Sequence, residues 1–312
     1  MHSPILSQWV GSLDTFTKEY WHRRPGVFKP DCPPTPFTIE DLDAALSGGL
    51  LRSPYLVMTR TGPDGKSDPL LCTSSRTVHQ ATYEGFADEG QIIAQLEHGG
   101  TLLLHRIDQW HAPTRELLAS LAVELGRRIE AFFFVTPAGE QGLPLHRDDA
   151  DVIVVQITGS KRWYVHAGPE SGDWRPDRVP DGETPAELLQ VTLCPGEVLY
   201  IPRGFAHRAA GSGGLSTHLS LTIREVITRD LLRSLQRALL EGLELAQRPV
   251  GDEALTATAS AAIDHFRERI ADISADEILD AAREVDMKRL AAGYSGPRLS
   301  ALAEKWNATE RQ

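Results

Sequence analysis

The sequence has few cysteines, no excess of basic residues and no long hydrophobic run. Three cysteines without a C-x-x-C spacing indicate reduced thiols, so we expect a cytoplasmic location. Asp and Glu (43) outnumber Lys and Arg (32), and the net charge of −11 argues against a nucleic-acid partner. No apolar run reaches the roughly eighteen residues of a membrane span, and no cationic stretch leads into an apolar one near the start. We therefore expect neither a membrane segment nor a secretory signal.

The hydrophobic pattern divides the 312 residues into three parts. Residues 1–100 mix short helical and strand-like segments and are expected to pack on the part that follows. Residues 101–225 contain an amphipathic helix predicted at 114–130 and then a series of β-rich runs. Residues 226–312 return to a helical period. The predicted fold class is α+β, with a mainly β core.

The β-rich runs show no helical period among them, which favours a β-sandwich or small barrel. They cover 131–136, 152–158, 161–166, 197–201 and 216–223. In the helical part, four leucines share one predicted helix face: Leu232, Leu235, Leu239 and Leu243.

The candidate site begins at His146 and Asp148, which lie two residues apart. On an extended strand such residues point to the same face, so both side chains can reach one metal ion. His207 follows a strand bracketed by two turns, Pro195-Gly196 and Pro202-Arg-Gly204. Two histidines and one carboxylate leave open metal positions and are typical of non-haem Fe(II) oxygenases.

Two other carboxylates, Asp149 and Asp151, compete for this role. Only Asp148 has the two-residue spacing to His146, and Asp149 is expected to face away. The alternative is a chance H-x-D in a surface turn, because eleven histidines make such a pair unremarkable.

Lys161 lies in Thr158-Gly-Ser-Lys-Arg-Trp163. We predict a two-residue hairpin loop at Gly159-Ser160, which places Thr158 and Lys161 on one face, with Trp163 on the same side. An inward lysine needs an anionic partner, since an unpaired buried ammonium is costly, and a dicarboxylate would supply one. An exposed hairpin lysine is the alternative, and both remain open at this point.

A last polar face is formed by His218, Ser220 and Thr222, which alternate with apolar residues. They either line the cavity or are solvated.

Several segments in the right order identify a family resemblance. They include Tyr20-Trp-His-Arg-Arg-Pro, the stretch from Val135 through Asp148, and Gln156 through Trp163. The list continues with Pro195 through His207 and with His218-Leu-Ser-Leu-Thr. The chain resembles the JmjC-domain oxygenases of the cupin superfamily, and within them the ribosomal-oxygenase-like group.

The resemblance implies a double-stranded β-helix, the jelly-roll barrel of cupins. It implies Fe(II) held by His146, Asp148 and His207, with 2-oxoglutarate and O₂ as co-substrates. Lys161 then lies where the family binds the distal carboxylate of 2-oxoglutarate, which favours the inward orientation. The helices after residue 226 are implied to form a homodimer.

Two departures from the family are visible. Phe132 and Phe134 replace polar residues that help to bind 2-oxoglutarate in relatives, so Ser220 and Thr222 are the predicted additional contacts. The chain also leaves no room for the full C-terminal winged-helix domain of longer members. Residues expected at the substrate pocket are Arg147, Trp163, Arg203, His218 and Phe134.

The predicted function is hydroxylation of a protein side chain, a ribosomal protein being the family's usual target. A hydroxylase of a free amino acid, peptide or small metabolite is the alternative, favoured by the missing winged-helix domain. Lysine demethylation and a metal-binding cupin without redox chemistry rank below these. Lys161 argues against the last, because a fixed cation has no evident role there without a dicarboxylate.

Overall fold

The computed structural model describes residues 4–62, 64–292 and 299–309. The chain forms two compact units. The first runs to Leu125 and from Ile129 to Arg224, and the second comprises 126–128 and the part from Glu225 onward.

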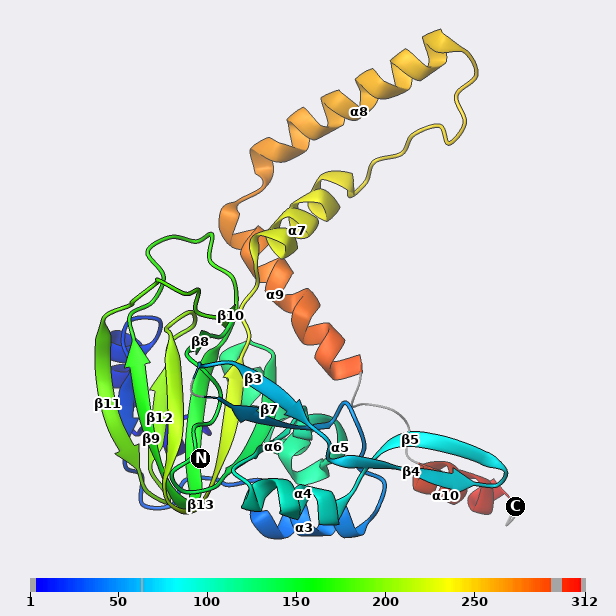
Figure 1. Ribbon diagram of the computed structural model, residues 1–312. Coiled ribbons are helices and arrows are strands. Elements are labelled where there is room, and N and C mark those ends of the chain that lie inside the picture. Colours follow the sequence, from blue (N-terminus) through cyan, green and yellow to red (C-terminus); the bar gives the residue numbers. More distant parts are fainter. Residues whose placement is uncertain (1–3, 63, 293–298, 310–312) are drawn as a thin grey trace. The chain divides into compact units, whose positions relative to one another are not determined.

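The first unit is built on an eleven-stranded sheet whose pairs are all antiparallel (Figure 1). The order is β1-β12-β9-β13-β7-β6-β2-β3, with β11 on β9 and β8 joining β13 to β10. The strands are β1 (Gly26–Phe28), β2 (Leu56–Thr61), β3 (Ser67–Leu70), β6 (Thr101–Leu104), β7 (Ile129–Thr136), β8 (His146–Arg147), β9 (Asp151–His166), β10 (Asp177–Arg178), β11 (Glu187–Leu193), β12 (Val198–Ile201) and β13 (His207–Ile223). This arrangement confirms the predicted mainly β core.

The hairpin predicted at Gly159-Ser160 is wrong. The runs 152–158 and 161–166 form one long strand, β9, which pairs with the long strand β13 over most of its length. Gly159 has φ +58, and a Cβ there would lie 2.6 Å from the carbonyl oxygen of Leu215. A glycine is therefore required where β13 passes closely, and it bends the strand without reversing it. Lys161 and Trp163 still share one face, because the alternation resumes after the bend.

Short helices flank the sheet: α1 (Ser7–Val10), α2 (Leu13–Thr15), the π-helical turn η1 (Phe16–Tyr20), α3 (Ile39–Ser47), α4 (Glu89–Glu97), α5 (Ile107–Trp110) and α6 (Ala112–Leu125). A separate hairpin consists of β4 (Thr73–Val78) and β5 (Ala81–Ala87). The helix predicted at 114–130 is α6, which ends earlier because Gly126 adopts φ +60, a common helix terminator. The chain then enters β7 at Ile129.

The second unit is helical, with α7 (Thr228–Leu240), α8 (Asp252–Asp272), α9 (Ala275–Ala292) and α10 (Leu299–Thr309). A capping box begins α9, where Ser274 Oγ accepts from the Glu277 N–H and the Glu277 carboxylate accepts from the Ser274 N–H. Leu243 lies beyond the end of α7, so its predicted place on that helix face is wrong. Among the described helices, none has both the length and the apolar character needed to cross a membrane.

Candidate metal centre and co-substrate pocket

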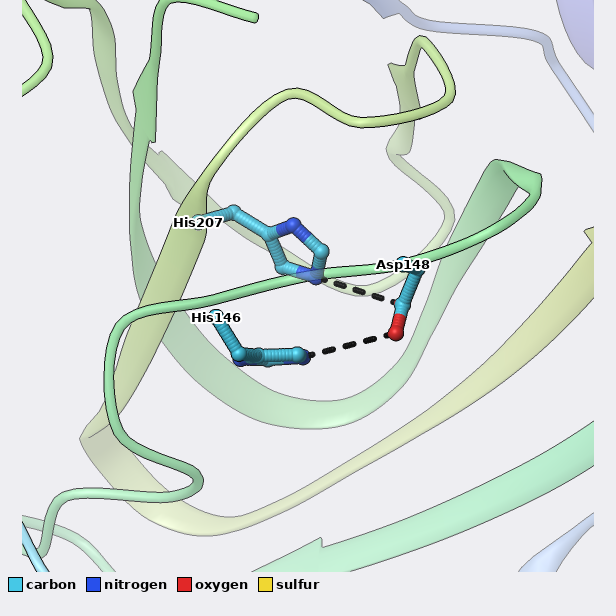
Figure 2. Close-up of side chains that lie close together, drawn as sticks. All are labelled: His146, Asp148 and His207. Atoms are coloured by element: carbon cyan, nitrogen blue, oxygen red, sulfur yellow. Dashed lines mark ion pairs between the residues drawn. The ribbon is translucent and has the colours of Figure 1, made fainter. Parts of the chain in front are cut away.

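The side chains of the two histidines and the carboxylate lie close together (Figure 2). His146 on β8 is the register partner of His207, the first residue of β13. Nε2 of His146 lies 3.9 Å from Asp148 Oδ1, and Nε2 of His207 lies 3.6 Å from Asp148 Oδ2. All three ligand atoms are within 4.8 Å of one another, which one ion can span.

Backbone carbonyls set the tautomers of both imidazoles. His146 Nδ1 lies 2.7 Å from the oxygen of Pro144, and His207 Nδ1 lies 3.1 Å from that of Phe205. Nδ1 therefore carries the proton, and the Nε2 lone pair faces the shared point. Burial, followed by the nearby His146, lowers the pKa of His207 to about 4. Its imidazole is thus neutral near pH 7, as metal coordination requires.

The structure brings Asp148, and neither neighbouring aspartate, to the histidines. The Asp149 carboxylate accepts a 2.6 Å hydrogen bond from Nε of Arg203. Asp151 is buried and accepts a 2.5 Å hydrogen bond from the Tyr200 hydroxyl. Each of the three carboxylates thus has a different set of partners.

A cavity of about 250 Å³ extends from this point into the first unit. The expected residues Lys161, Ser220 and Thr222 line it, as do Phe134, Trp163 and His218. Because β7, β9 and β13 are neighbours in the sheet, their inward residues meet in one chamber. The cavity interpretation of the polar face on β13 therefore holds over the solvated one.

Lys161 is 2% exposed and has no carboxylate partner among the described residues. Its ammonium donates one hydrogen bond, 2.9 Å long, to the hydroxyl of Thr136. Burial lowers the pKa of Lys161 from 10.5 to about 7. Such an amine favours the binding of an anion, because a carboxylate would supply the negative charge that compensates the buried ammonium.

Aromatic rings surround this amine. The rings of Phe134 and His218 stack with their centroids 4.6 Å apart at an interplanar angle of 5°, and Trp163 meets His218 edge-on at 5.2 Å. Trp163 Nε1 and His218 Nδ1 are both buried, and neither has a hydrogen-bond partner among the residues that the structure describes. Burial lowers the pKa of His218 well below its usual value, so the ring is neutral. An unpaired buried donor costs about 1–3 kcal/mol, which a ligand acceptor would recover.

Two residues expected at the substrate pocket lie elsewhere. Arg147 follows His146 on β8 and so points to the opposite face, where it donates to the carbonyls of Gly204 and Ala167 and pairs with Glu183. Arg203 pairs with Asp149. Neither side chain lines this cavity, and a role for either arginine at the substrate rim stays a prediction.

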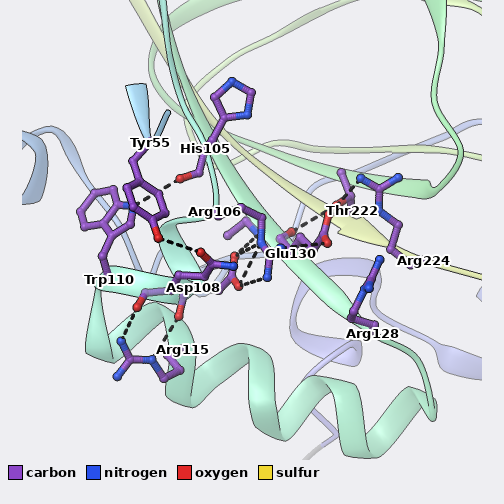
Figure 3. A network of polar contacts seen from close by, with 12 residues as sticks. Tyr55, His105, Arg106, Asp108, Trp110, Arg115, Arg128, Glu130, Thr222 and Arg224 are labelled. Carbon is purple, nitrogen blue, oxygen red and sulfur yellow. Dashed lines mark hydrogen bonds and ion pairs between the residues drawn. The ribbon is translucent and has the colours of Figure 1, made fainter. Parts of the chain in front are cut away.

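Arg224, which we did not single out from the sequence, lines the cavity instead. Its guanidinium donates twice to Glu130 Oε2, at 2.9 and 3.0 Å, and once to the backbone oxygen of Asp149. Figure 3 shows the continuation of this network, in which Arg106 contacts both Glu130 and the buried Asp108. The sequence pattern could not indicate this pair, because a long arginine side chain can contact partners that are far away along the chain.

The donor set fits a divalent transition metal. Neutral imidazole nitrogens and one carboxylate, facing a cavity with room for further ligands, form the facial arrangement of non-haem Fe(II) sites. Such a set leaves positions for a chelating co-substrate.

Residues 106–231 match the family model described as the JmjC domain. This segment is a JmjC domain. It spans β7 to β13 and therefore contains the three converging side chains together with Lys161.

The relatives of this chain include ribosomal oxygenases. Ribosomal oxygenase 2 of Rattus norvegicus is 27% identical over 220 residues, which cover 68% of this chain and 44% of the relative. Ribosomal oxygenase 1 of Gallus gallus is 27% identical over 260 residues, covering 78% and 41%. A Dictyostelium discoideum protein named bifunctional lysine-specific demethylase and histidyl-hydroxylase NO66 is 28% identical over 175 residues, covering 53% and 34%. The chain thus spans less than half the length of these relatives.

The fold is shared with a solved structure. The structure of the Escherichia coli ribosomal oxygenase YcfD in complex with cobalt and 2-oxoglutarate superposes with a TM-score of 0.54 at 19% identity. The match covers 84% of this chain and 70% of that chain. At this identity the likeness establishes the JmjC/cupin fold, as the sequence predicted.

Proposed function

We propose that the chain is an Fe(II)- and 2-oxoglutarate-dependent oxygenase that hydroxylates a protein side chain, with a ribosomal protein as the target. One observation supports this proposal most strongly: a single cavity contains a cluster of two histidines and one carboxylate together with a buried lysine. This lysine has no carboxylate partner among the described residues. The names of the relatives, and the cobalt and 2-oxoglutarate bound by YcfD, support the same assignment.

In this proposal, His146, Asp148 and His207 hold Fe(II). The bound iron would supply O₂ activation, so that substrate C–H, 2-oxoglutarate and O₂ yield substrate C–OH, succinate and CO₂. The protein supplies orientation and a largely enclosed pocket. The neutral imidazole of His207 requires no deprotonation before it binds metal at neutral pH.

Lys161 would pair with the distal carboxylate of 2-oxoglutarate, assisted by the Thr136 hydroxyl beside it. The strand β7 offers Phe134 where relatives have a polar group, so other donors must complete the pocket. Ser220 and Thr222 bring hydroxyls into the cavity, and Trp163 and His218 bring unpartnered ring nitrogens. These groups fit an oxygen-rich anion better than an apolar ligand.

The direct test is anaerobic binding of Fe(II) and 2-oxoglutarate, followed by succinate release in air with candidate substrates. A mixture of ribosomal proteins should increase succinate release and gain 16 Da on one side chain. Formaldehyde release from methylated lysine would instead identify a demethylase, the first of the two activities in the name of the NO66 relative. Stimulation by free amino acids or small metabolites alone would replace the protein substrate. Failure to bind 2-oxoglutarate would overturn the oxygenase assignment and favour a non-redox cupin.

We also propose that the helical second unit mediates a homodimer. Within this unit, several large apolar side chains are more than 45% exposed: Leu232, Leu240, Leu255, Ile263 and Ile270. Pairing with a second copy would remove this surface from water, at about 25 cal/mol per Å². Substitution of one of these apolar side chains by a charged residue, followed by measurement of the molecular mass in solution, tests the dimer.

A cytoplasmic setting belongs to the proposal as well. Cys32 and Cys194 are exposed free thiols. A reducing compartment keeps such thiols from oxidising. Fractionation of cells expressing the chain would test this placement, and recovery in an oxidising compartment would contradict it.

A further inference from the structure

The loop from Asp148 to Asp151 decides where the carboxylate ligand lies. The Asp148 side chain is 38% exposed, whereas those of His207 and His146 are 6% and 17% exposed. Packing therefore fixes the histidines far more than it fixes Asp148. The position of an exposed side chain depends mainly on how firmly its backbone is held.

Asp151 is the buried anchor of this loop. It is 1% exposed, and its Oδ1 accepts hydrogen bonds from the Tyr200 hydroxyl at 2.5 Å and from the Arg203 N–H at 3.2 Å. Nδ1 of His22 lies 3.3 Å from the other carboxylate oxygen. Both oxygens of a buried carboxylate are thus in contact with polar partners, the arrangement that makes such a group rigid.

The N-terminal aromatic-basic segment forms the outer wall of this anchor. The backbone N–H of His22 donates to the Tyr200 hydroxyl at 3.0 Å, while the ring of Tyr200 meets Phe16 edge-on and stacks with Trp21. His22 adopts φ +59, a conformation uncommon outside glycine. In that conformation its backbone N–H meets Tyr200 and its imidazole meets Asp151. The N-terminal aromatic-basic segment has no part in the proposed reaction. It nevertheless contacts Asp151, in the loop that carries Asp148.

The same cluster connects Asp148 to His207. Tyr200 and Arg203 belong to the segment that leads directly into His207, and the N–H of Gly204 in that segment donates to the backbone oxygen of Asp148 at 3.0 Å. The loop is thus bonded at both ends to the segment that carries the second histidine. A shift of Asp151 would move Asp148 relative to His207.

We propose that His22, Asp151 and Tyr200 are positioning residues that set Asp148 against the two histidines and thereby set metal affinity. The inference rests on the proposed metal site. Asp151 and Tyr200 do not themselves face the converging ligand atoms, so they act through Asp148. Loss of outer partners of metal ligands typically costs 10–100-fold in affinity.

The test is Co(II) binding by the full-length, metal-free protein, followed by the visible d–d absorption of the bound ion. Tyr200→Phe removes one donor and keeps the ring, and Asp151→Asn keeps the shape and removes the charge. We expect each to weaken Co(II) binding about 10-fold and to alter the d–d bands. Tyr20→Phe, in the same aromatic cluster but without a hydrogen bond from its hydroxyl in the described structure, is the matched control and should bind as wild type.

The His22 side chain is 41% exposed, so its variants test the idea without disturbing the core. His22→Ala should weaken Co(II) binding, and His22→Asn, whose amide can replace Nδ1, should restore it. In an Asp148→Ala background, His22→Ala should cause no further loss. Wild-type affinity in both His22→Ala and Tyr200→Phe, even with a lowered melting temperature, would overturn the inference. So would an undiminished effect of His22→Ala in the Asp148→Ala background. Absence of Co(II) binding by wild type would instead overturn the proposed metal site itself.

Discussion

The ammonium of Lys161 donates its single side-chain hydrogen bond to the hydroxyl of Thr136, at 2.9 Å, inside a cavity that also contains the cluster of His146, Asp148 and His207. A hydroxyl cannot neutralise a buried charge. The buried lysine therefore destabilises the free protein, and it favours the binding of a carboxylate beside it.

Lys161→Met should make the metal-free protein more stable and abolish 2-oxoglutarate binding. Replacing a buried amine with an apolar side chain of similar length removes the desolvation cost, and each kcal/mol gained raises the melting temperature by about 2–4 °C for a domain of roughly 150–250 residues. Thermal unfolding and calorimetric titration measure the two effects. Equal 2-oxoglutarate affinity in Lys161→Met and wild type would contradict the assigned partner.

The affinity for 2-oxoglutarate should fall as pH rises above about 7. Burial holds the pKa of Lys161 near 7, so the ammonium that pairs with a carboxylate is fully present only below that pH. Above it, each pH unit should weaken binding up to about tenfold, because a proton must be taken up first. Titrations at pH 6, 7, 8 and 9 with Mn(II) in place of iron measure the slope.

The stability of the free protein has the opposite pH dependence. In the unfolded chain the lysine keeps its ordinary pKa near 10.5, so between about pH 7 and 10 the unfolded state binds the extra proton. The contribution of Lys161 to folding therefore becomes more favourable as pH rises through this window. Lys161→Met lacks both slopes, which makes it the control.

Alanine at His146, Asp148 or His207 should weaken metal binding strongly and leave only residual affinity. Removal of a direct ligand should lower metal affinity by more than the roughly 10–100-fold that is typical when an outer partner of a ligand is removed. Asp149→Asn is the matched control, because its carboxylate faces Arg203 and should leave Mn(II) affinity near wild type. Electron paramagnetic resonance of free Mn(II) gives the constants, and wild-type affinity in Asp148→Ala would refute the chosen carboxylate.

Trp163→Phe and His218→Phe should each weaken 2-oxoglutarate binding about tenfold, the value of one hydrogen bond to a charged group. Each change keeps an aromatic ring and removes a buried nitrogen for which the described part of the chain offers no partner. Binding of 2-oxopentanoate, which lacks the distal carboxylate, should be the same in wild type and variants. Equal losses for both ligands would show that the rings act by shape alone.

Leu232→Glu should convert a dimer into a monomer of 34.3 kDa. Leu232 on α7 is 61% exposed, and a charge there would be buried in the proposed interface. Arg233→Gln, the neighbouring exposed position, is the control. Light scattering during gel filtration gives the mass, and a monomeric wild type would refute the dimer.

The sequence predicted the side chains that share a face because strand alternation is a local rule. It brought His146 and Asp148 together and grouped His218, Ser220 and Thr222, and all five line the cavity. It also separated Asp148 from Asp149, whose side chain pairs with Arg203. The grouping on β13 needs only the period of a strand, whereas Asp148 lies one residue past the end of β8 and keeps the side of His146 without being part of the strand.

The remaining features depend on what lies opposite in space. A Gly-Ser pair reads as a hairpin loop, but at Gly159 the close passage of Leu215 on β13 makes it a bend in a continuous strand. Arg147 was expected at the rim, yet buried carbonyls of Gly204 and Ala167 bind it on the far face. Neither partner is near in sequence, so no local pattern could indicate it.

The continuity of β9 and β13 has a consequence for ligand length. Gly211, the register partner of Lys161, lies on the same unbroken strand as His207. An extended strand can barely be stretched or shortened, so the span from metal to amine is set by covalent backbone rather than by mobile loops. If the proposed function is correct, the site should therefore select diacids by their length. It should accept the five-carbon 2-oxoglutarate and reject both oxaloacetate, one carbon shorter, and 2-oxoadipate, one carbon longer.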